Sequence, residues 1–137
     1  MEELPDTAQI DKMLANSGYS ARAIRYFIDK PNIGSISNPD YSTEMTGSCG
    51  DTMSVSLKFE NGSIRDIKYQ VLGCPGAVAA AMAVADLAKG KTIAEARTLN
   101  DGHVFRLLEE IPATKHHCIQ LAVKTLQKAL TEYSQKS

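Results

Sequence analysis

Residues 53–59 and 64–71 constrain the fold of this chain more than any other part of the sequence. The segment MSVSLKF alternates apolar and polar residues strictly, which places its apolar side chains on one face of a β-strand. The segment IRDIKYQV has the composition of a partner strand, although its alternation is less regular. Asn61-Gly62 stands between them and favours the two-residue turn of a β-hairpin. The sequence therefore predicts a hairpin, to which residues 42–47 are expected to add a third strand.

Helical patterns flank the predicted hairpin on both sides. Residues 6–17 carry apolar side chains at helical spacing, with Asp6 as the expected N-cap and Gly18 at the end. A second helix is expected to begin at a Ser20 cap and to end before Pro31. Four more helices are expected after the hairpin, at 76–90, 92–99, 101–110 and 114–133. This order predicts an α+β fold, with helices packed on one face of a small three-stranded antiparallel sheet.

The length and composition fit one globular domain over residues 1–137. Apolar residues make up 43% of the chain and charged residues 23%, and the formal net charge is -1. Because this charge is nearly balanced, neither nucleic acid nor an anionic membrane is expected as a partner. The longest apolar run, residues 77–85, is too short to span a bilayer. The acidic N-terminus lacks the apolar core of a signal peptide, so a cytoplasmic location is expected.

Each of the three cysteines lies at the end of a predicted element. Cys49 sits between two glycines in the turn TGSCGD, directly before a strand. Cys74, in LGCPG, lies between a strand and a helix, and Cys118 falls in the first turn of the last helix, with Thr114 as the expected cap. Thiols at a helix N-terminus face the positive end of the helix dipole, which favours the thiolate. Ligands and nucleophiles cluster at such positions, whereas an odd number of cysteines argues against a disulfide framework.

Nitrogen and oxygen donors accompany these thiols. Asp51 follows Cys49 by two positions, and a histidine pair, His116 and His117, precedes Cys118. Neighbouring helical residues face different directions, so only one histidine of the pair is expected to point toward a shared site. His103 is expected to be a surface or capping residue. Three thiols, an imidazole and a carboxylate form a donor set that suits a zinc ion or an iron–sulfur cluster.

The motifs as a group resemble the U-type iron–sulfur cluster scaffold proteins, IscU and the N-terminal domain of NifU. The resemblance runs from about Tyr19 to Tyr133 and rests on YSARAIRYFIDKPNIGSI, GSCGDTM, GCPGAVAAAM and IPATKHHC. It implies a cluster site, with [2Fe–2S] as the expected cluster, formed by Cys49, Asp51, Cys74, His117 and Cys118. It also implies a scaffold rather than an enzyme. The cluster would be assembled from iron and persulfide sulfur, supplied by a cysteine desulfurase, and then passed to apo-proteins.

The chemistry of the donors agrees with that implication. Asp51 supplies a harder oxygen ligand than a fourth thiolate would, so the mixed set is expected to hold a cluster less tightly than four cysteines do. A scaffold must release its product, so weak holding is useful. The glycines at positions 47 and 50 are expected to let the turn that carries Cys49 and Asp51 move.

Two features depart from the family pattern. Family members that work with a dedicated Hsp70-type chaperone carry a Leu-Pro-Pro-Val-Lys segment before the His-Cys pair, and here residues 111–115 are IPATK. Chaperone docking is therefore expected to be weak or absent. Residues 1–18 lie outside the resemblance and are expected to form an extra helical segment.

Two other functions compete with the scaffold hypothesis. One is a zinc-bound sulfur-transfer protein of the SufU type. Such relatives typically carry an insertion between the second and third cysteine motifs, and no insertion is evident between Gly90 and Pro112. The other is a cysteine hydrolase that uses Cys118 and a histidine, which would leave Cys49 and Cys74 without a task. Zinc also fits the scaffold's own donor set.

Overall fold

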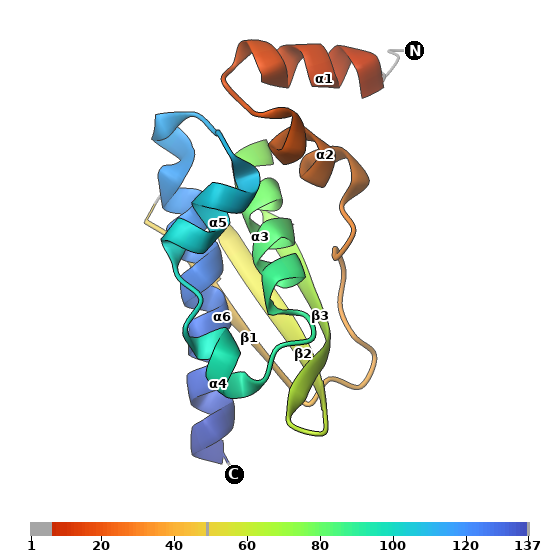
Figure 1. Cartoon of the computed structure of the whole chain (residues 1–137), viewed down its shortest axis with the longest axis vertical. Helices are drawn as coiled ribbons and strands as arrows, with labels where there is room; N and C mark the ends of the chain where they lie inside the picture. The colour runs from red at the N-terminus through yellow and green to blue at the C-terminus, as the bar shows by residue number, and fades with distance from the viewer. Residues whose placement is uncertain (1–6, 49, 137) are drawn as a thin grey trace.

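The computed structural model describes residues 7–48 and 50–136. Its elements follow one another as α1 (Thr7–Asn16), α2 (Ala21–Asp29), β1 (Tyr41–Thr46), β2 (Thr52–Glu60), β3 (Ser63–Leu72), α3 (Pro75–Ala88), α4 (Ile93–Arg97), α5 (Asp101–Leu108), the 3-10 turn η1 (Ala113–Lys115) and α6 (His116–Lys136). Figure 1 shows them as helices arranged against one small sheet. The predicted α+β class is confirmed. The expected Asp6 cap lies outside the described residues.

The sheet is antiparallel with the order β1-β2-β3. Asn61 and Gly62 form the predicted turn between β2 and β3, and both have positive φ angles, 55° and 80°, as a type I′ hairpin requires. The alternation in β2 places Met53, Val55 and Leu57 on the covered face, where all three are fully buried. A register shift after Lys58 explains why the pattern of β3 is less regular than that of β2.

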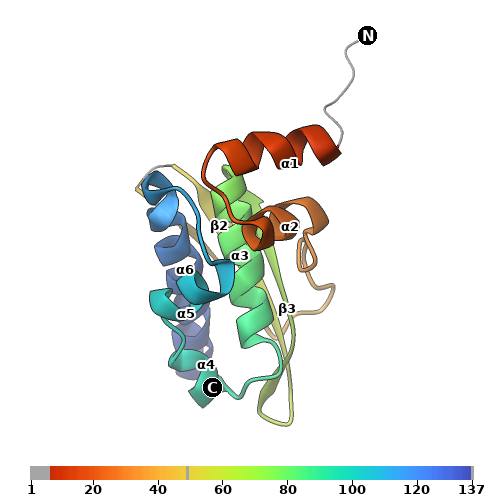
Figure 2. The same ribbon diagram turned by 45° about the horizontal axis from the view of Figure 1, so that its top comes forward.

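Helices α3 and α6 lie side by side across the covered face of the sheet (Figures 1 and 2). Helix α3 is rich in alanine and almost entirely buried, so its backbone comes close to both the sheet and α6. Helix α6 buries its predicted apolar stripe, which includes Cys118, Ile119, Ala122, Leu126, Ala129 and Leu130. Both helices begin at the same end of the sheet, and this arrangement places their N-termini together.

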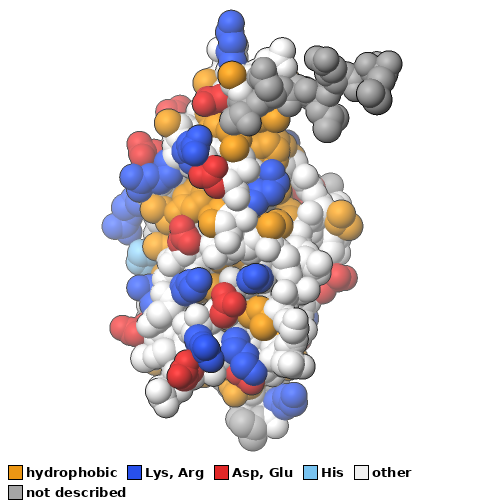
Figure 3. All heavy atoms as spheres, turned by 90° about the vertical axis from the view of Figure 1, so that its right-hand side faces the viewer, with side chains coloured by type: hydrophobic (Ala, Val, Ile, Leu, Met, Phe, Trp, Pro, Cys, Tyr) orange, Lys and Arg blue, Asp and Glu red, His pale blue; other side chains and the backbone are white. Residues whose placement is uncertain are grey.

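Helix α2 packs on α3, and α1 packs on α2 at the same end of the molecule. Seen from the right-hand side of Figure 1, the surface mixes acidic and basic side chains with hydrophobic ones that gather in its upper half (Figure 3). Among the side chains of residues 7–48 and 50–136 seen on this face, there is therefore no large patch of one charge sign. Within residues 7–48 and 50–136, no helix combines the length and the apolar character needed to cross a membrane.

The start of the last helix differs from the prediction. Thr114 does not cap it, because residues 113–115 form a 3-10 turn in which the Lys115 N–H donates to the Pro112 carbonyl at 2.8 Å. Helix α6 begins only at His116. Cys118 remains in its first turn, as expected.

Candidate functional site

The antiparallel sheet brings two of the predicted site segments together. Thr52, the first residue of β2, pairs with Leu72, the last residue of β3. Asp51 directly precedes β2 and Cys74 follows β3 by two residues, so both lie at the same end of the sheet. Cys74 is the N-cap of α3, with an extended backbone, and its thiol makes no capping hydrogen bond. The thiol is therefore available for another role.

Cys118 is the centre of the site. Its Sγ lies 3.8 Å from Cys74 Sγ, 3.8 Å from Asp51 Oδ2 and 3.6 Å from His117 Nε2. The donor atoms of Asp51, His117 and Cys118 all lie within 4.8 Å of one another. Cys74 joins this group through its contact with Cys118. Of the five predicted site residues, the structure thus brings four together, and Cys49 lies outside the described residues.

Two of the separations from Cys118 match the edges of a tetrahedral metal site. Two sulfurs that each bind zinc at about 2.3 Å with tetrahedral angles stand about 3.8 Å apart, and a sulfur and a nitrogen stand about 3.5 Å apart. The measured Cys74–Cys118 and Cys118–His117 distances are 3.8 Å and 3.6 Å. Cys118 is fully buried, whereas the other three side chains are partly exposed. Ligands of this kind suit iron or zinc at a site that is open on one side.

The side chains of His116 and His117 point in different directions, as those of neighbouring helical residues do. His117 faces Cys118, while the His116 ring lies edge-on against Phe105, with ring centroids 4.8 Å apart. His103 takes the capping role expected for it, since its Nδ1 accepts a hydrogen bond from the Asn100 N–H at 3.1 Å in the cap of α5. Geometry therefore places His117, and neither of the other two, among the donors.

Two glycines beside Cys74 leave room for site residues. A Cβ on Gly73 would stand 2.9 Å from Asp51 Cγ, which is closer than real Cβ contacts. A Cβ on Gly76 would stand 3.1 Å from Lys115 Cβ and 3.2 Å from the Tyr19 hydroxyl. The motif GCPG contained both glycines, but only the packing shows which neighbours require them.

Tyr19 and Lys115 line the site, although the sequence did not predict Tyr19 there. Burial raises the pKa of Tyr19, and the negative charges of Cys74 and Cys118 raise it further, whereas Lys115 lowers it. The pKa of Lys115 is also raised, chiefly by the charge of Cys74. The charge of Cys118 raises the pKa of Lys115 less than that of Cys74 does.

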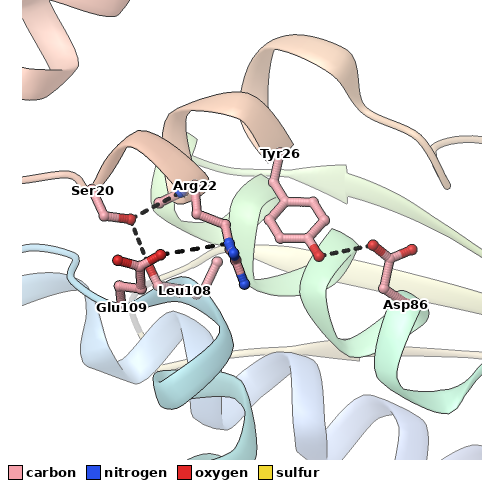
Figure 4. Close-up of polar contacts among 7 residues, drawn as sticks. Ser20, Arg22, Tyr26, Asp86, Leu108 and Glu109 are labelled. Atoms are coloured by element: carbon pink, nitrogen blue, oxygen red, sulfur yellow. Dashed lines mark hydrogen bonds and ion pairs between the residues drawn. The ribbon is translucent and has the colours of Figure 1, made fainter.

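The N-terminus of α2 holds the segment that leads to Lys115. The Ser20 hydroxyl accepts from the Ala23 N–H at 3.0 Å and donates to the Leu108 carbonyl, and the Ser20 N–H donates to the Glu110 carbonyl at 2.7 Å. Arg22 pairs with Glu109 at 3.5 Å, and Tyr26 donates to Asp86 of α3 at 2.8 Å (Figure 4). These contacts fix α2 against α3 and against the chain between α5 and η1.

The Glu109 backbone in this segment is strained. Its φ and ψ are 69° and −64°, and the Glu110 N–H donates to the Leu108 carbonyl at 2.8 Å. This is a γ-turn of the rare, strained kind, and it persists only where the surroundings hold it. Here the hydrogen bonds from Ser20 to the Leu108 and Glu110 carbonyls hold the chain on either side of Glu109.

Comparisons with known proteins agree with the fold and the motifs. The scaffold protein IscU 1 of Archaeoglobus fulgidus, named for iron–sulfur cluster assembly, is 35% identical over 87% of this chain and 78% of its own length. The IscU scaffold of Haemophilus influenzae is 32% identical over 86% of this chain and 97% of its own.

Solved structures show the same fold. A putative scaffold for the SUF system from Fervidobacterium islandicum matches with a TM-score of 0.67 and 24% identity, over 82% of this chain and 96% of that one. A NifU-like N-terminal protein from Brucella abortus matches with a TM-score of 0.69 and 19% identity, over 86% and 95%. At these identities, the two structures support the fold alone. The model of the family described as "NifU-like N terminal domain" matches residues 18–137, and the chain belongs to that family.

Proposed function

We propose that this protein is a scaffold on which an iron–sulfur cluster is assembled from iron and persulfide sulfur and then passed to apo-proteins. The main support is the arrangement around Cys118, whose sulfur lies 3.6–3.8 Å from a second sulfur, a histidine nitrogen and a carboxylate oxygen. Family membership and the names of the relatives point the same way. Residues 1–137 are proposed to act as one domain, with α1 as an addition outside the matched region.

The proposed ligands are Asp51, Cys74, His117 and Cys118, together with Cys49 from the turn before Asp51. Asp51 is proposed as the most easily exchanged ligand, because a carboxylate binds iron less strongly than a thiolate does. Its position directly before β2, partly exposed, leaves one side of the site open to an acceptor. The cluster is proposed to be [2Fe–2S], as the family resemblance implies, and four of these five donors would suffice to hold it.

Sulfur is proposed to arrive by transfer between thiols. A thiolate of the site attacks the outer sulfur of a persulfide on a cysteine desulfurase, forms a new S–S bond and releases the donor's cysteine as a thiolate. Reduction of this persulfide to sulfide then needs two electrons from an external reductant. The scaffold supplies ligands and a sulfur acceptor, and the desulfurase carries out the catalysis. Thiol ligands of this kind need a reducing compartment, so we propose a cytoplasmic site of action.

Anaerobic reconstitution tests this function directly. The protein is mixed with ferrous iron, cysteine, a reductant and a catalytic amount of a cysteine desulfurase, and visible and Mössbauer spectra are recorded. We expect the spectrum of a protein-bound cluster, which transfers to an apo-ferredoxin. A Cys118→Ser variant is the matched control and should take up much less. A wild-type protein that binds no cluster under these conditions would contradict the proposal.

A zinc-bound sulfur-transfer protein is the second candidate, and one observation favours it. The distances from Cys118 to Cys74 and His117 equal those of a tetrahedral zinc site. The segment between Gly90 and Pro112 counts against this candidate. It contains only two short helices and their connections, and it lacks the insertion typical of SufU relatives. Metal analysis of the protein as isolated separates the two functions. Tightly bound zinc that blocks cluster assembly, with retained sulfur acceptance, would support this second candidate.

Docking of an Hsp70-type chaperone is proposed to be weak. Residues 113–115 form a 3-10 turn, in which Ala113 and Thr114 are exposed. The second proline and the valine of the chaperone-binding pattern are absent here. Losing a buried apolar side chain costs about 1–2 kcal/mol, which corresponds to roughly tenfold weaker binding. Titration of the peptide EEIPATKHH against such a chaperone, beside a peptide with Leu-Pro-Pro-Val-Lys, measures the difference, and equal affinities would show that the departure has no effect.

A further inference from the structure

The two edges of the sheet differ in what covers them. At the β3 edge, the Tyr69 N–H donates to the Asn32 carbonyl at 2.9 Å, and the Gly34 N–H donates to the Tyr69 carbonyl at 2.8 Å. Nearer the hairpin, the Ile64 N–H donates to the Lys91 carbonyl at 2.8 Å. Strand β1 forms the other edge, and no backbone group of residues 7–48 and 50–136 bonds to its outer side. Edge strands often carry a lysine or a proline that discourages further pairing, and the sequence of β1, YSTEMT, has neither.

The pairing of β1 with β2 shows which backbone groups face outward. The Gly47 N–H donates to the Asp51 carbonyl at 2.8 Å, and the register from there to Tyr41↔Leu57 is unbroken. Along an antiparallel pair, every second residue bonds to the neighbouring strand, and the residues between them point their backbone groups away from it. The N–H and C=O groups that face away from β2 therefore belong to Ser42, Glu44 and Thr46. An additional strand can pair with these groups.

A groove beside this edge would receive the side chains of an added strand. Helix α6 packs against β1 (Figure 1), and two adjoining hollows between them share Met45 and Lys124. Together the hollows run from His117 to Gln135, which is roughly 27 Å at about 1.5 Å per helical residue. An extended segment of about eight residues has this length. The groove begins at the candidate site, because His117 is one of the donors there.

Side chains of opposite charge flank β1. Lys124 lines the groove, is exposed, and makes no hydrogen bond or ion pair within the described part of the chain. Lys128 and Glu132 line the same groove, but they pair with each other at 2.9 Å. Glu44 is exposed on the uncovered face of the sheet, and among the described residues it too has no ion pair. Because the side chains of a strand alternate between its two faces, an added strand meets Lys124 on one face and Glu44 on the other.

We infer that β1 is the docking edge for a partner protein, which adds an extended segment as a fourth strand. That segment carries an acidic side chain toward Lys124 and a basic side chain toward Glu44. Main-chain hydrogen bonds supply the affinity, and the alternating side chains supply the specificity. A second copy of this chain fits less well, because antiparallel pairing of β1 with itself brings two Glu44 carboxylates together on one face.

The position of β1 relates this edge to the candidate site. The strand ends at Thr46, shortly before Asp51, and the groove reaches His117. Residues of the partner beyond the added strand would therefore lie beside the proposed ligands. This arrangement fits a partner that exchanges sulfur or a cluster with the site. That choice of partner rests on the proposed function, whereas the strand addition does not.

The test uses two synthetic peptides of the same composition with the metal-free, full-length protein. In TVKETVT the valines and the glutamate share one face of the strand, and the lysine lies on the other. In TVEKTVT the two charges are exchanged. Dissociation constants are measured by fluorescence anisotropy, and amide hydrogen exchange is followed by NMR for each residue of β1. A form of TVKETVT that is methylated on the backbone nitrogens of its lysine and glutamate blocks strand pairing in either direction.

Protein variants test the edge and the groove separately. Ser42→Pro removes an outward N–H without breaking a hydrogen bond to β2, since proline is accepted at such edge positions. Ser42→Ala keeps the N–H and is the matched control. Lys124→Glu reverses the charge in the groove. Thermal unfolding checks the fold of each variant, and the methylated peptide tests the pairing without any change in the protein.

We expect TVKETVT to slow exchange of the three outward amides of β1 by about tenfold or more, whereas Thr43 and Met45 are already protected by β2 in the free protein. The wild type should bind TVKETVT about tenfold more tightly than TVEKTVT, because two exposed charge pairs change from attraction to repulsion. Lys124→Glu should remove most of this preference. Ser42→Pro and methylation of the peptide should each weaken binding by about tenfold, and Ser42→Ala should match the wild type.

Unchanged exchange of the outward amides with millimolar TVKETVT would overturn the inference. Equal affinities for the two peptides would refute the assigned charges, and undiminished binding of the methylated peptide would refute strand addition. Sedimentation analysis tests the second copy, since self-association that protects the same amides would show that β1 joins two copies instead. The proposed function fails separately, if the wild-type protein assembles no cluster with a desulfurase even though the peptides bind in the expected order.

Discussion

Substitution of Gly73 by alanine should displace Asp51 from the candidate site without disturbing the fold. Gly73 is not among the glycines with positive φ angles, so alanine can adopt its backbone conformation. The added Cβ would stand 2.9 Å from Asp51 Cγ and 3.1 Å from both Asp51 Oδ1 and Ala77 Cβ. Ordinary contacts of this kind begin near 3.4 Å, so one neighbour must move by about half an ångström. Ala77 belongs to the buried helix α3, and the Asp51 carboxylate therefore moves.

The expected magnitude follows from what this displacement does to metal binding. A residue that only orients a ligand usually changes metal affinity by about 10- to 100-fold. We expect Gly73→Ala to weaken zinc binding at least tenfold, or about 1.4 kcal/mol. Alanine reduces the entropy of the unfolded chain by about 0.4–1 kcal/mol, which offsets part of the packing cost of about 1–3 kcal/mol. The unfolding free energy of the metal-free protein should therefore fall by no more than about 2.6 kcal/mol.

The assay is a double-mutant cycle with Asp51→Ala. Zinc dissociation constants are measured by chelator competition for the wild type, Gly73→Ala, Asp51→Ala and the double variant. If Gly73 acts through Asp51, the second substitution adds almost nothing to the effect of the first. Additive losses would refute the reasoning, because the two residues would then act independently. Wild-type affinity in Gly73→Ala would show that the carboxylate does not bind the metal.

Four further predictions follow from the geometry. Asp51→Ala should leave the fold intact and lengthen the half-life of a bound cluster, measured during transfer to an apo-ferredoxin. An unchanged half-life would contradict the proposed role of Asp51 as the most easily exchanged ligand. His117→Ala should lower zinc affinity more than His116→Ala does, since only His117 faces Cys118; the reverse order in the same competition assay would show that the assignment is wrong. Ser20→Ala removes both the cap of α2 and the hydrogen bond to Leu108, so urea unfolding should show a loss of about 1–2 kcal/mol, and a loss under 0.5 kcal/mol would contradict this. Burial and the bond to Asp86 raise the pKa of Tyr26 to about 12. Because the pKa of tyrosine in the unfolded chain is about 10, the stability due to the neutral form of Tyr26 is complete below pH ~10 and is lost as the pH rises toward 12. We therefore expect the unfolding free energy to fall more steeply with pH in this range for the wild type than for Tyr26→Phe.

Local signals in the sequence were sufficient for most of the fold. The alternation of residues 53–59 and the Asn61-Gly62 turn specify a hairpin from neighbouring residues alone, and the structure confirms it. The caps and the apolar stripes of the helices are also local patterns, as Ser20 and the buried face of α6 show. The start of α6 was misplaced by two residues, because a 3-10 turn and a cap on Thr114 have similar sequence signals.

The site itself depended on contacts between segments that are distant in the sequence. The motifs contained all the proposed ligands, and the family resemblance, now supported by the match to residues 18–137, singled out His117 from its neighbour. The sequence did not reveal the roles of Gly73, Gly76 and Tyr19, because each role depends on a contact across the fold. Gly73 faces Asp51, which lies 22 residues earlier in the chain, and Gly76 faces both Lys115 and Tyr19. Periodicity in a sequence reports which face of an element is buried, whereas the contact made by that face is set only when α3, α6 and the end of the sheet pack together.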